Sequence, residues 1–190
     1  MFTKKNKYFL FIENIKDIDL KNIKIRDKFS IIYRTNKNID NLDNLLIFRR
    51  KCKLKGIKLY IANNSALAVS LNSDGIYLSS FNKSLSSLNL IKSNFEIIGS
   101  AHNFKEILLK EKQGCSFILL SKLFIVDYDK KAPYLGVVKF NNFSKISKKI
   151  IPLGGIKISN LNSLKNTISE GLAILSEVKK KPANIINRLF

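Results

Sequence analysis

The sequence predicts an α/β protein, a (β/α)8 or TIM barrel, in which eight parallel strands close on themselves inside a ring of helices. Short apolar runs alternate regularly with polar stretches that carry helix signals. Several of the runs are apolar throughout, which is typical of parallel strands that helices cover. With 190 residues, the chain is long enough for one full core and too short for two ordinary domains. We therefore expect residues 1–190 to form a single barrel domain.

The expected strands share a short length and a mostly apolar composition. They are residues 8–12, 29–33, 57–61, 76–78, 95–98, 117–120, 150–153 and 172–175. Eight strand–helix repeats joined by right-handed crossovers favour closure into a barrel, with an open doubly wound sheet as the alternative.

Helix signals lie between these runs. Asn103 can cap a helix with Phe104, Ile107 and Leu108 on one face, and Gly114 follows its end. A second helix is expected to start at Asp40 or Asn38 and to end before Gly56. A third is expected to start at Ser159 or Asn160 and to run through Leu161, Leu164 and Ile168. The first crossover, residues 13–28, has only a weak helix pattern. The longest loop is expected at 121–142, and 184–190 could form a closing helix.

The composition excludes some classes of protein. No run of 18 apolar residues is present, and the apolar run at 9–12 is too short for a signal peptide. Cys52 and Cys115 lack metal or redox spacing, so we expect buried free thiols. Together these features predict a soluble, cytoplasmic protein with no membrane partner.

The net charge of +20 raises the question of nucleic-acid binding. However, lysines are spread over almost every segment, arginine is scarce, and most aromatic residues fall inside apolar runs. Base readout depends largely on arginine, and single-strand binding on exposed aromatics. A basic, solvated surface without a nucleic-acid partner is therefore the favoured interpretation. Nucleic-acid binding, the alternative, predicts a steep dependence of affinity on salt.

A phosphate site is expected at the end of the seventh and eighth strands. Active sites of such barrels lie at the carboxyl ends of the strands, with phosphate commonly held after strands 7 and 8. Gly154 and Gly155 follow the seventh strand, and adjacent glycines let backbone N–H groups approach an anion. Leu175 and Ser176, after the eighth strand, could complete the cradle with backbone donors. The alternative is an ordinary left-handed turn.

Other candidate residues follow other strands. Arg34, after the second strand, suits a phosphate or diphosphate. His102 is the only histidine, so any imidazole acid–base chemistry must use it, although a lone histidine at a helix start more often caps or packs. Lys130 and Lys131 on the long loop could close over an anion or have no role.

Several motifs, in order, resemble the thiamine phosphate synthase family, which includes the thiazole tautomerases (the TenI branch). They are Tyr33-Arg34, residues 62–68, residues 73–78, Ser100-Ala101-His102, residues 135–140 and residues 153–156. The resemblance extends over residues 29–176. It implies that a hydroxymethylpyrimidine diphosphate is coupled to a thiazole phosphate and that diphosphate is released. Both substrates are then small-molecule partners, while the oligomeric state is not indicated.

The resemblance also implies roles for individual residues. Arg34 and Ser100 would bind the diphosphate, and His102 matches the histidine that the tautomerase branch uses in proton transfer. The implied thiazole phosphate cradle is Gly154, Gly155, Leu175 and Ser176.

The departures from the family pattern fall on the metal–diphosphate half. The family binds Mg²⁺ through two aspartates, whose positions are occupied here by Asn63 and Asn82. Two neutral amides make a much weaker Mg²⁺ site, so no metal ligands are predicted. Val126 and Tyr128 replace loop hydroxyls, and Lys130 is the residue that could serve as the loop's basic group.

Three hypotheses follow from this pattern. The chain is a divergent synthase that still couples the two substrates, a metal-independent tautomerase-like enzyme that uses His102, or a non-catalytic binder of a phosphorylated thiazole or thiamine phosphate.

Overall fold

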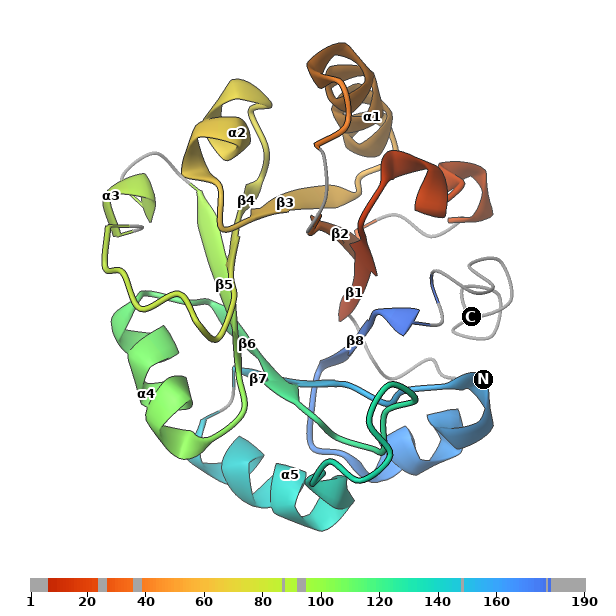
Figure 1. Cartoon of the computed structure of the whole chain (residues 1–190), viewed down its shortest axis with the longest axis vertical. Coiled ribbons are helices and arrows are strands. Elements are labelled where there is room, and N and C mark those ends of the chain that lie inside the picture. The colour runs from red at the N-terminus through yellow and green to blue at the C-terminus, as the bar shows by residue number, and fades with distance from the viewer. Residues whose placement is uncertain are drawn as a thin grey trace.

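The structure is a closed barrel of eight parallel strands in sequence order, with helices around the outside (Figure 1). It is a computed structural model that describes residues 7–23, 27–35, 39–86, 88–91, 95–147, 149–176 and 178. Each strand pairs in parallel with the next, and β1 pairs with β8 to close the ring. The predicted fold class is confirmed.

Every expected strand is present, with small shifts at the ends. The strands are β1 (Lys7–Ile12), β2 (Phe29–Tyr33), β3 (Lys58–Ala62), β4 (Gly75–Leu78), β5 (Glu96–Ala101), β6 (Phe117–Ser121), β7 (Ile150–Leu153) and β8 (Gly171–Ile174). The largest shift is at β5, which continues to Ala101. This extension carries Ser100 on the strand itself and places His102 directly after it.

The helical elements vary in length around the ring. They are α1 (Leu42–Leu54), α2 (Ser65–Ser70), α3 (Leu88–Ile91), α4 (Phe104–Lys112) and α5 (Gly136–Ile146), with the 3-10 segments η1 (Ile15–Asp17), η2 (Leu20–Asn22) and η3 (Ile158–Asn166). In the described part of the first crossover, residues 13–23 and 27–28, the helical elements are η1 and η2, in agreement with its weak helix pattern. Among the described residues, no helix is long and apolar enough to cross a membrane.

Asn103 caps α4 as predicted, and its side chain accepts a hydrogen bond from the Glu106 N–H. The predicted start of α1 at Asp40 is wrong. Asn41 is the cap, because the carboxylate of Asp40 accepts a hydrogen bond from the Tyr33 hydroxyl, at 3.0 Å, and one from Asn14. The alternative start at Asn38 lies outside the described residues.

Two further expectations needed correction. The helix expected from Ser159 or Asn160 is the 3-10 segment η3, which begins at Ile158 after Lys157 and leaves Ile168 outside it and exposed. The side chain of Asn160 accepts a hydrogen bond from the Lys157 N–H and donates one to the Gly155 carbonyl. Asn160 therefore stabilises a turn and does not start a helix. The long loop is also shorter than expected, since α5 begins at Gly136. The closing helix expected at 184–190 lies outside the described residues.

The core has two layers. One fills the barrel and consists of Phe9, Phe11, Ile32, Tyr60, Tyr77, Ile98, Leu119, Ile151 and Ala173. The other lies between the strands and the helices and includes Cys52 and Cys115, which are buried free thiols as expected. Alternate residues of each strand feed the two layers, so both faces of the sheet are apolar. Phe11 meets Tyr77 edge-to-face, with ring centroids 5.3 Å apart.

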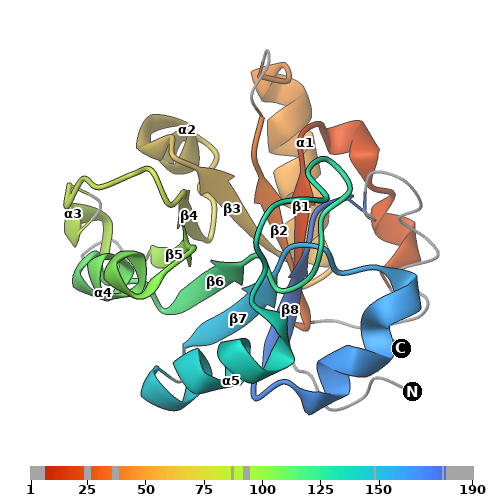
Figure 2. The ribbon, with the colours of Figure 1, turned by 60° about the horizontal axis from the view of Figure 1, so that its bottom comes forward.

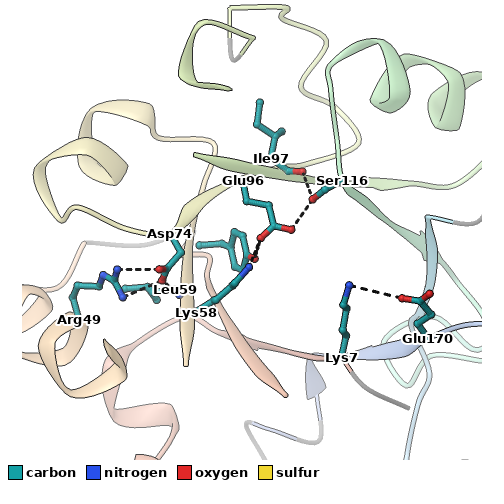
Figure 3. A network of polar contacts seen from close by, with 10 residues as sticks. Lys7, Arg49, Lys58, Leu59, Asp74, Glu96, Ile97, Ser116 and Glu170 are labelled. Carbon is teal, nitrogen blue, oxygen red and sulfur yellow. Dashed lines mark hydrogen bonds and ion pairs between the residues drawn. The ribbon is translucent and has the colours of Figure 1, made fainter. Parts of the chain in front are cut away.

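A network of ion pairs and hydrogen bonds ties together the amino ends of the strands (Figure 3). The Glu96 carboxylate accepts hydrogen bonds from Lys58, Tyr60 and Ser116, each at 2.7–2.8 Å. Asp74 accepts from the Leu59 N–H and pairs with Arg49. Asp74, which belongs to the motif at 73–78, therefore stabilises the end of the barrel opposite the expected active site.

Candidate active site

A cavity of about 450 Å³ lies at the carboxyl ends of the strands. It brings together most of the residues predicted from sequence. Those that line it are Arg34, Ser100, His102, Gly154, Gly155, Leu175 and Ser176. Other lining residues come from the loop between β6 and α5, residues 122–135, which Figure 2 shows in teal leaving β6 and returning to α5.

The turn after β7 has a backbone conformation that glycine adopts readily. Gly154 and Gly155 have φ of 90° and 68°, the left-handed region that favours glycine. The Gly154 carbonyl accepts from the Phe124 N–H at 3.1 Å, and the Gly155 carbonyl from the Asn160 amide at 2.8 Å. Within the described residues, no hydrogen bond from the Gly155 N–H to the protein is found, whereas Gly154 directly follows the bridge between Leu153 and Ala173. Such an N–H group can cradle an anion.

Across the cavity, Arg34 follows β2, and its backbone N–H is fixed to the Ile12 carbonyl at 2.8 Å. The Tyr77 hydroxyl donates to the Ser100 hydroxyl at 2.8 Å, and both side chains are buried. Burial raises the pKa of Tyr77, while the hydrogen bond with Ser100 and the charge of Arg34 act in the opposite direction. Sequence reasoning did not select Tyr77 as a site residue, although it lies within the motif at 73–78.

His102 is oriented by the first turn of α4. The Glu106 carboxylate contacts His102 Nδ1 at 3.1 Å and accepts from the His102 N–H at 2.8 Å. Asn103 holds the other carboxylate oxygen at 2.8 Å. When Nδ1–H donates to Glu106, the imidazole Nε2 carries the lone pair and can accept a proton. Glu106 was missed from sequence, although its position three residues after the Asn103 cap is a capping-box signal.

The side-chain amides of Asn63 and Asn82, predicted from the resemblance to occupy the family's metal positions, lie together. The Asn63 side-chain oxygen accepts from the Ser79 N–H at 3.0 Å and from the Asn82 amide at 3.4 Å. Asn63 has a φ of 53°, which an asparagine tolerates. The Asn63 side-chain oxygen, which would face a cation, therefore already accepts hydrogen bonds and carries no charge. Within the described part of the chain, no group of three or more His, Cys, Asp or Glu side chains could hold a metal ion. These residues do not fit Mg²⁺ well.

The loop that carries Asn82 is anchored from behind by α4. Lys110 is fully buried, and its ammonium donates to the carbonyls of Ser79 and Asn82 at 2.7 and 2.8 Å. Gln113, also fully buried, donates to the Asn82 and Ser84 carbonyls. Burial lowers the pKa of Lys110. This anchor holds the loop that lines the cavity through Ser79, Ser80 and Phe81.

Lys130 is exposed and does not line the cavity. The same loop instead contributes Val126, Asp127 and Tyr128. Lys157, directly after the glycine turn and Ile156, also lines the cavity and forms an ion pair with Asp127. Sequence reasoning missed Lys157, because one lysine in so basic a chain carries no distinguishing pattern.

The family model described as thiamine monophosphate synthase matches residues 4–178. A thiamine-phosphate synthase of Flavobacterium psychrophilum is 27% identical over 151 residues, which cover 74% of this chain and 73% of that protein. One of Prochlorococcus marinus is 25% identical over 88% of this chain, which spans 47% of that relative. The solved structure of a thiamine phosphate pyrophosphorylase from Pyrococcus furiosus superposes with a TM-score of 0.78 at 16% identity, over 98% of this chain and 94% of that one.

Proposed function

The chain belongs to the thiamine monophosphate synthase family, and from that premise we propose that it joins a hydroxymethylpyrimidine diphosphate to a thiazole phosphate. In this reaction the bond between the pyrimidine methylene carbon and the diphosphate oxygen breaks. The thiazole nitrogen supplies the electron pair of the new carbon–nitrogen bond, and diphosphate leaves with the electrons of the broken bond. The products are thiamine phosphate and diphosphate.

A single observation carries this proposal: one cavity is lined both by the glycine turn after β7 and by Arg34 after β2. The Gly154–Gly155 turn, with Leu175 and Ser176, is assigned to the thiazole phosphate. Arg34, on the other side, is assigned to the diphosphate, because its guanidinium can bind phosphate oxygens in a bidentate manner. Holding both substrates in one orientation is a large part of what such a transfer requires.

On the diphosphate side, the charge that develops on the leaving group is assigned to Arg34 and to the hydroxyl of Ser100, which Tyr77 positions. The family uses Mg²⁺ here, but Asn63 and Asn82 are neutral and hydrogen bonded to each other. The proposal therefore assigns no step to a metal ion. Lys130 remains proposed as a further diphosphate contact of the loop.

The test is incubation of the protein with both substrates, in Mg²⁺ and in EDTA, with thiamine phosphate measured as product. We expect product with the wild type and a loss of at least about a hundredfold in Arg34→Ala, because a charge-stabilising donor is removed. Arg50→Ala, on the exposed side of α1, is the matched control and should retain activity. Absence of product under both conditions would rule out the coupling reaction.

A second candidate function is a metal-independent, tautomerase-like proton transfer. The observation that favours it is the contact of His102 Nδ1 with Glu106, which orients Nε2 as a proton acceptor at the cavity. In this case EDTA should have no effect on turnover, and His102→Ala should abolish it. Solvent deuterium exchange into a thiazole phosphate, followed by NMR, measures this activity directly. Binding of thiazole phosphate with neither activity would instead indicate a non-catalytic binder.

A further inference from the structure

Lys157 follows closely after the Gly154–Gly155 turn, which is called the phosphate turn below, and its backbone is held in place. Its backbone N–H donates to the Asn160 side chain at 2.8 Å, and Asn160 also holds the Gly155 carbonyl. The backbone of Lys157 is thereby fixed relative to the two glycines. Lys157 lines the same cavity as the glycine turn, and its ammonium forms an ion pair with Asp127, which also lines that cavity.

Asp127 belongs to a loop that is fixed at its base. The N–H groups of Leu123 and Phe124 donate to the carbonyls of Leu153 and Gly154, so the loop begins as an extension alongside β7. Its tip, where Val126 pairs with Asp129, lines the cavity through Val126, Asp127 and Tyr128. The ion pair thus joins the tip of this loop to the residue that follows the phosphate turn.

The ion pair is of a kind that a stronger anion can replace. The Lys157 and Asp127 side chains are 31% and 45% exposed, and pairs this accessible to water contribute little to stability. A phosphate monoester carries more negative charge than a carboxylate and offers three acceptor oxygens. A phosphate bound at the Gly154–Gly155 turn would therefore compete with Asp127 for the ammonium.

We propose that Lys157 is a phosphate-binding residue and that the phosphate of the ligand displaces Asp127 from it. This inference rests on the phosphate-binding role proposed for the Gly154–Gly155 turn. When Lys157 exchanges Asp127 for the phosphate, the tip of the β6–α5 loop is released from η3. Phosphate binding and release of the loop tip are therefore coupled. Because such coupling is reciprocal, whatever weakens the hold of Asp127 on Lys157 strengthens phosphate binding.

This mechanism predicts effects of opposite sign at the two partners. Lys157→Met removes a charged hydrogen bond to the phosphate and should weaken binding by about tenfold. Asp127→Asn frees Lys157 from its competing anion and should tighten binding by about two- to fivefold. In the Lys157→Met background, Asp127→Asn should have no effect. If the pair only held the loop in place, both single substitutions would weaken binding.

The experiment is calorimetric titration of the full chain with inorganic phosphate at constant ionic strength. Lys165→Met, an exposed lysine of η3, is the matched control for loss of one positive charge and should bind as the wild type does. Lys157→Arg should retain the affinity, because the charge remains. If Lys157→Met does not fold, as judged by circular dichroism, the tightening in Asp127→Asn still decides the question.

The outcomes separate this inference from the proposed function. Weaker or unchanged binding in Asp127→Asn would overturn the partner exchange, as would wild-type affinity in Lys157→Met, whether or not the enzyme couples its substrates. Failure of the wild type to bind phosphate would overturn the exchange together with the cradle. The predicted opposite shifts would support the exchange even if no thiamine phosphate were formed.

Discussion

Asn63 and Asn82, which the resemblance assigns to the family's two metal-binding positions, lie in contact, and their neutral charge determines what they can bind. The Asn82 amide nitrogen is 3.4 Å from the Asn63 side-chain oxygen, so their loops bring the two side chains together. Carboxylates at both positions would repel each other unless a cation lay between them.

We therefore predict that Asn63→Asp combined with Asn82→Asp introduces Mg²⁺ binding, with an affinity in the roughly millimolar range. Aspartate tolerates the left-handed backbone of position 63 nearly as well as asparagine does. Calorimetric titration with Mg²⁺ measures the effect. Asn64→Asp is the control, because Asn64 faces the Leu67 N–H as a helix cap. Equal Mg²⁺ binding by the double variant and this control would contradict the prediction.

Some residues of the candidate site could be predicted from the sequence, and others could not. His102 could be selected from sequence because it is the only histidine, and Gly154 and Gly155 because they follow the seventh strand. Lys157 could not, because its proposed role depends on its ion pair with Asp127, a residue of another loop. Selecting it required the distance between two segments that are far apart in the chain.

The proposed phosphate cradle depends on the contact between the turn after β7 and the β6–α5 loop. A Cβ at position 155 would lie 2.5 Å from the carbonyl oxygens of Phe124 and Ile125, closer than any real contact. These are backbone atoms of a segment that the N–H groups of Leu123 and Phe124 bond to the carbonyls of Leu153 and Gly154, so they cannot easily move away.

Gly155→Ala should accordingly weaken phosphate binding and lower the free energy of unfolding by roughly 2 to 3 kcal/mol, from backbone strain and the clash together. Gly136 makes a matched control. Its φ is also 68°, but a Cβ there would meet nothing within 4 Å. Gly136→Ala should therefore show only the backbone cost, about 1 kcal/mol, and normal phosphate binding. Urea denaturation and phosphate titration measure both quantities, and equal effects of the two substitutions would refute the packing argument.

At the other end of the strands, Glu96 should contribute to stability and not to catalysis. Burial alone would raise the pKa of Glu96, but its hydrogen bonds with Lys58, Tyr60 and Ser116 outweigh this, and the pKa lies below the ordinary value. A lowered carboxylate pKa means that the stabilisation is present at neutral pH. It is lost as the pH falls through the folded-state pKa.

We expect Glu96→Gln to lower the free energy of unfolding by roughly 1 to 3 kcal/mol at neutral pH, because buried hydrogen bonds to a charged acceptor are lost. Its stability should also fall less steeply in acid than that of the wild type. Glu170→Gln removes the exposed pair with Lys7 and should change little. Urea denaturation as a function of pH tests this, and identical acid profiles of Glu96→Gln and wild type would contradict it.

Strands were easier to predict than the connections between them. An apolar run flanked by polar stretches is a local signal, and all eight runs form strands. The start of α1 was misplaced because Asp40 has a tertiary partner, the Tyr33 hydroxyl, that its own segment does not reveal. The region of η3 was expected as an α-helix from its spacing, but Asn160 closes a turn onto Gly155 and Lys157 instead.

At the scale of the whole molecule, the barrel followed from the number and spacing of the strands, and its closed topology placed the candidate residues at one end. What topology does not determine is the electrostatic character of that end. The same barrel can hold aspartates or asparagines at positions 63 and 82. For the same reason, the expectation that the +20 charge serves no nucleic-acid partner stays a prediction.

The cysteine thiols and tyrosine hydroxyls buried in the core should make the free energy of unfolding sensitive to alkaline pH. Burial raises the pKa of Cys52 and of Cys115 to about 12, well above the ordinary value of a thiol, and it also raises the pKa of Tyr60. A raised pKa means that the folded state keeps its proton where the unfolded state loses it. The stability is then fully present below about pH 9 and is lost as the pH rises through the folded-state pKa.

The pKa of Lys110 is lowered by burial, and its contribution has the opposite sign. One such group only partly offsets two thiols and the buried tyrosines, so stability should decline from about pH 9 upward. Urea denaturation at a series of pH values measures the slope. Cys115→Ala should be less stable throughout, because it leaves a cavity, yet its alkaline slope should be shallower, because one titrating thiol is gone. A slope equal to that of the wild type would mean that the thiol does not control the alkaline transition.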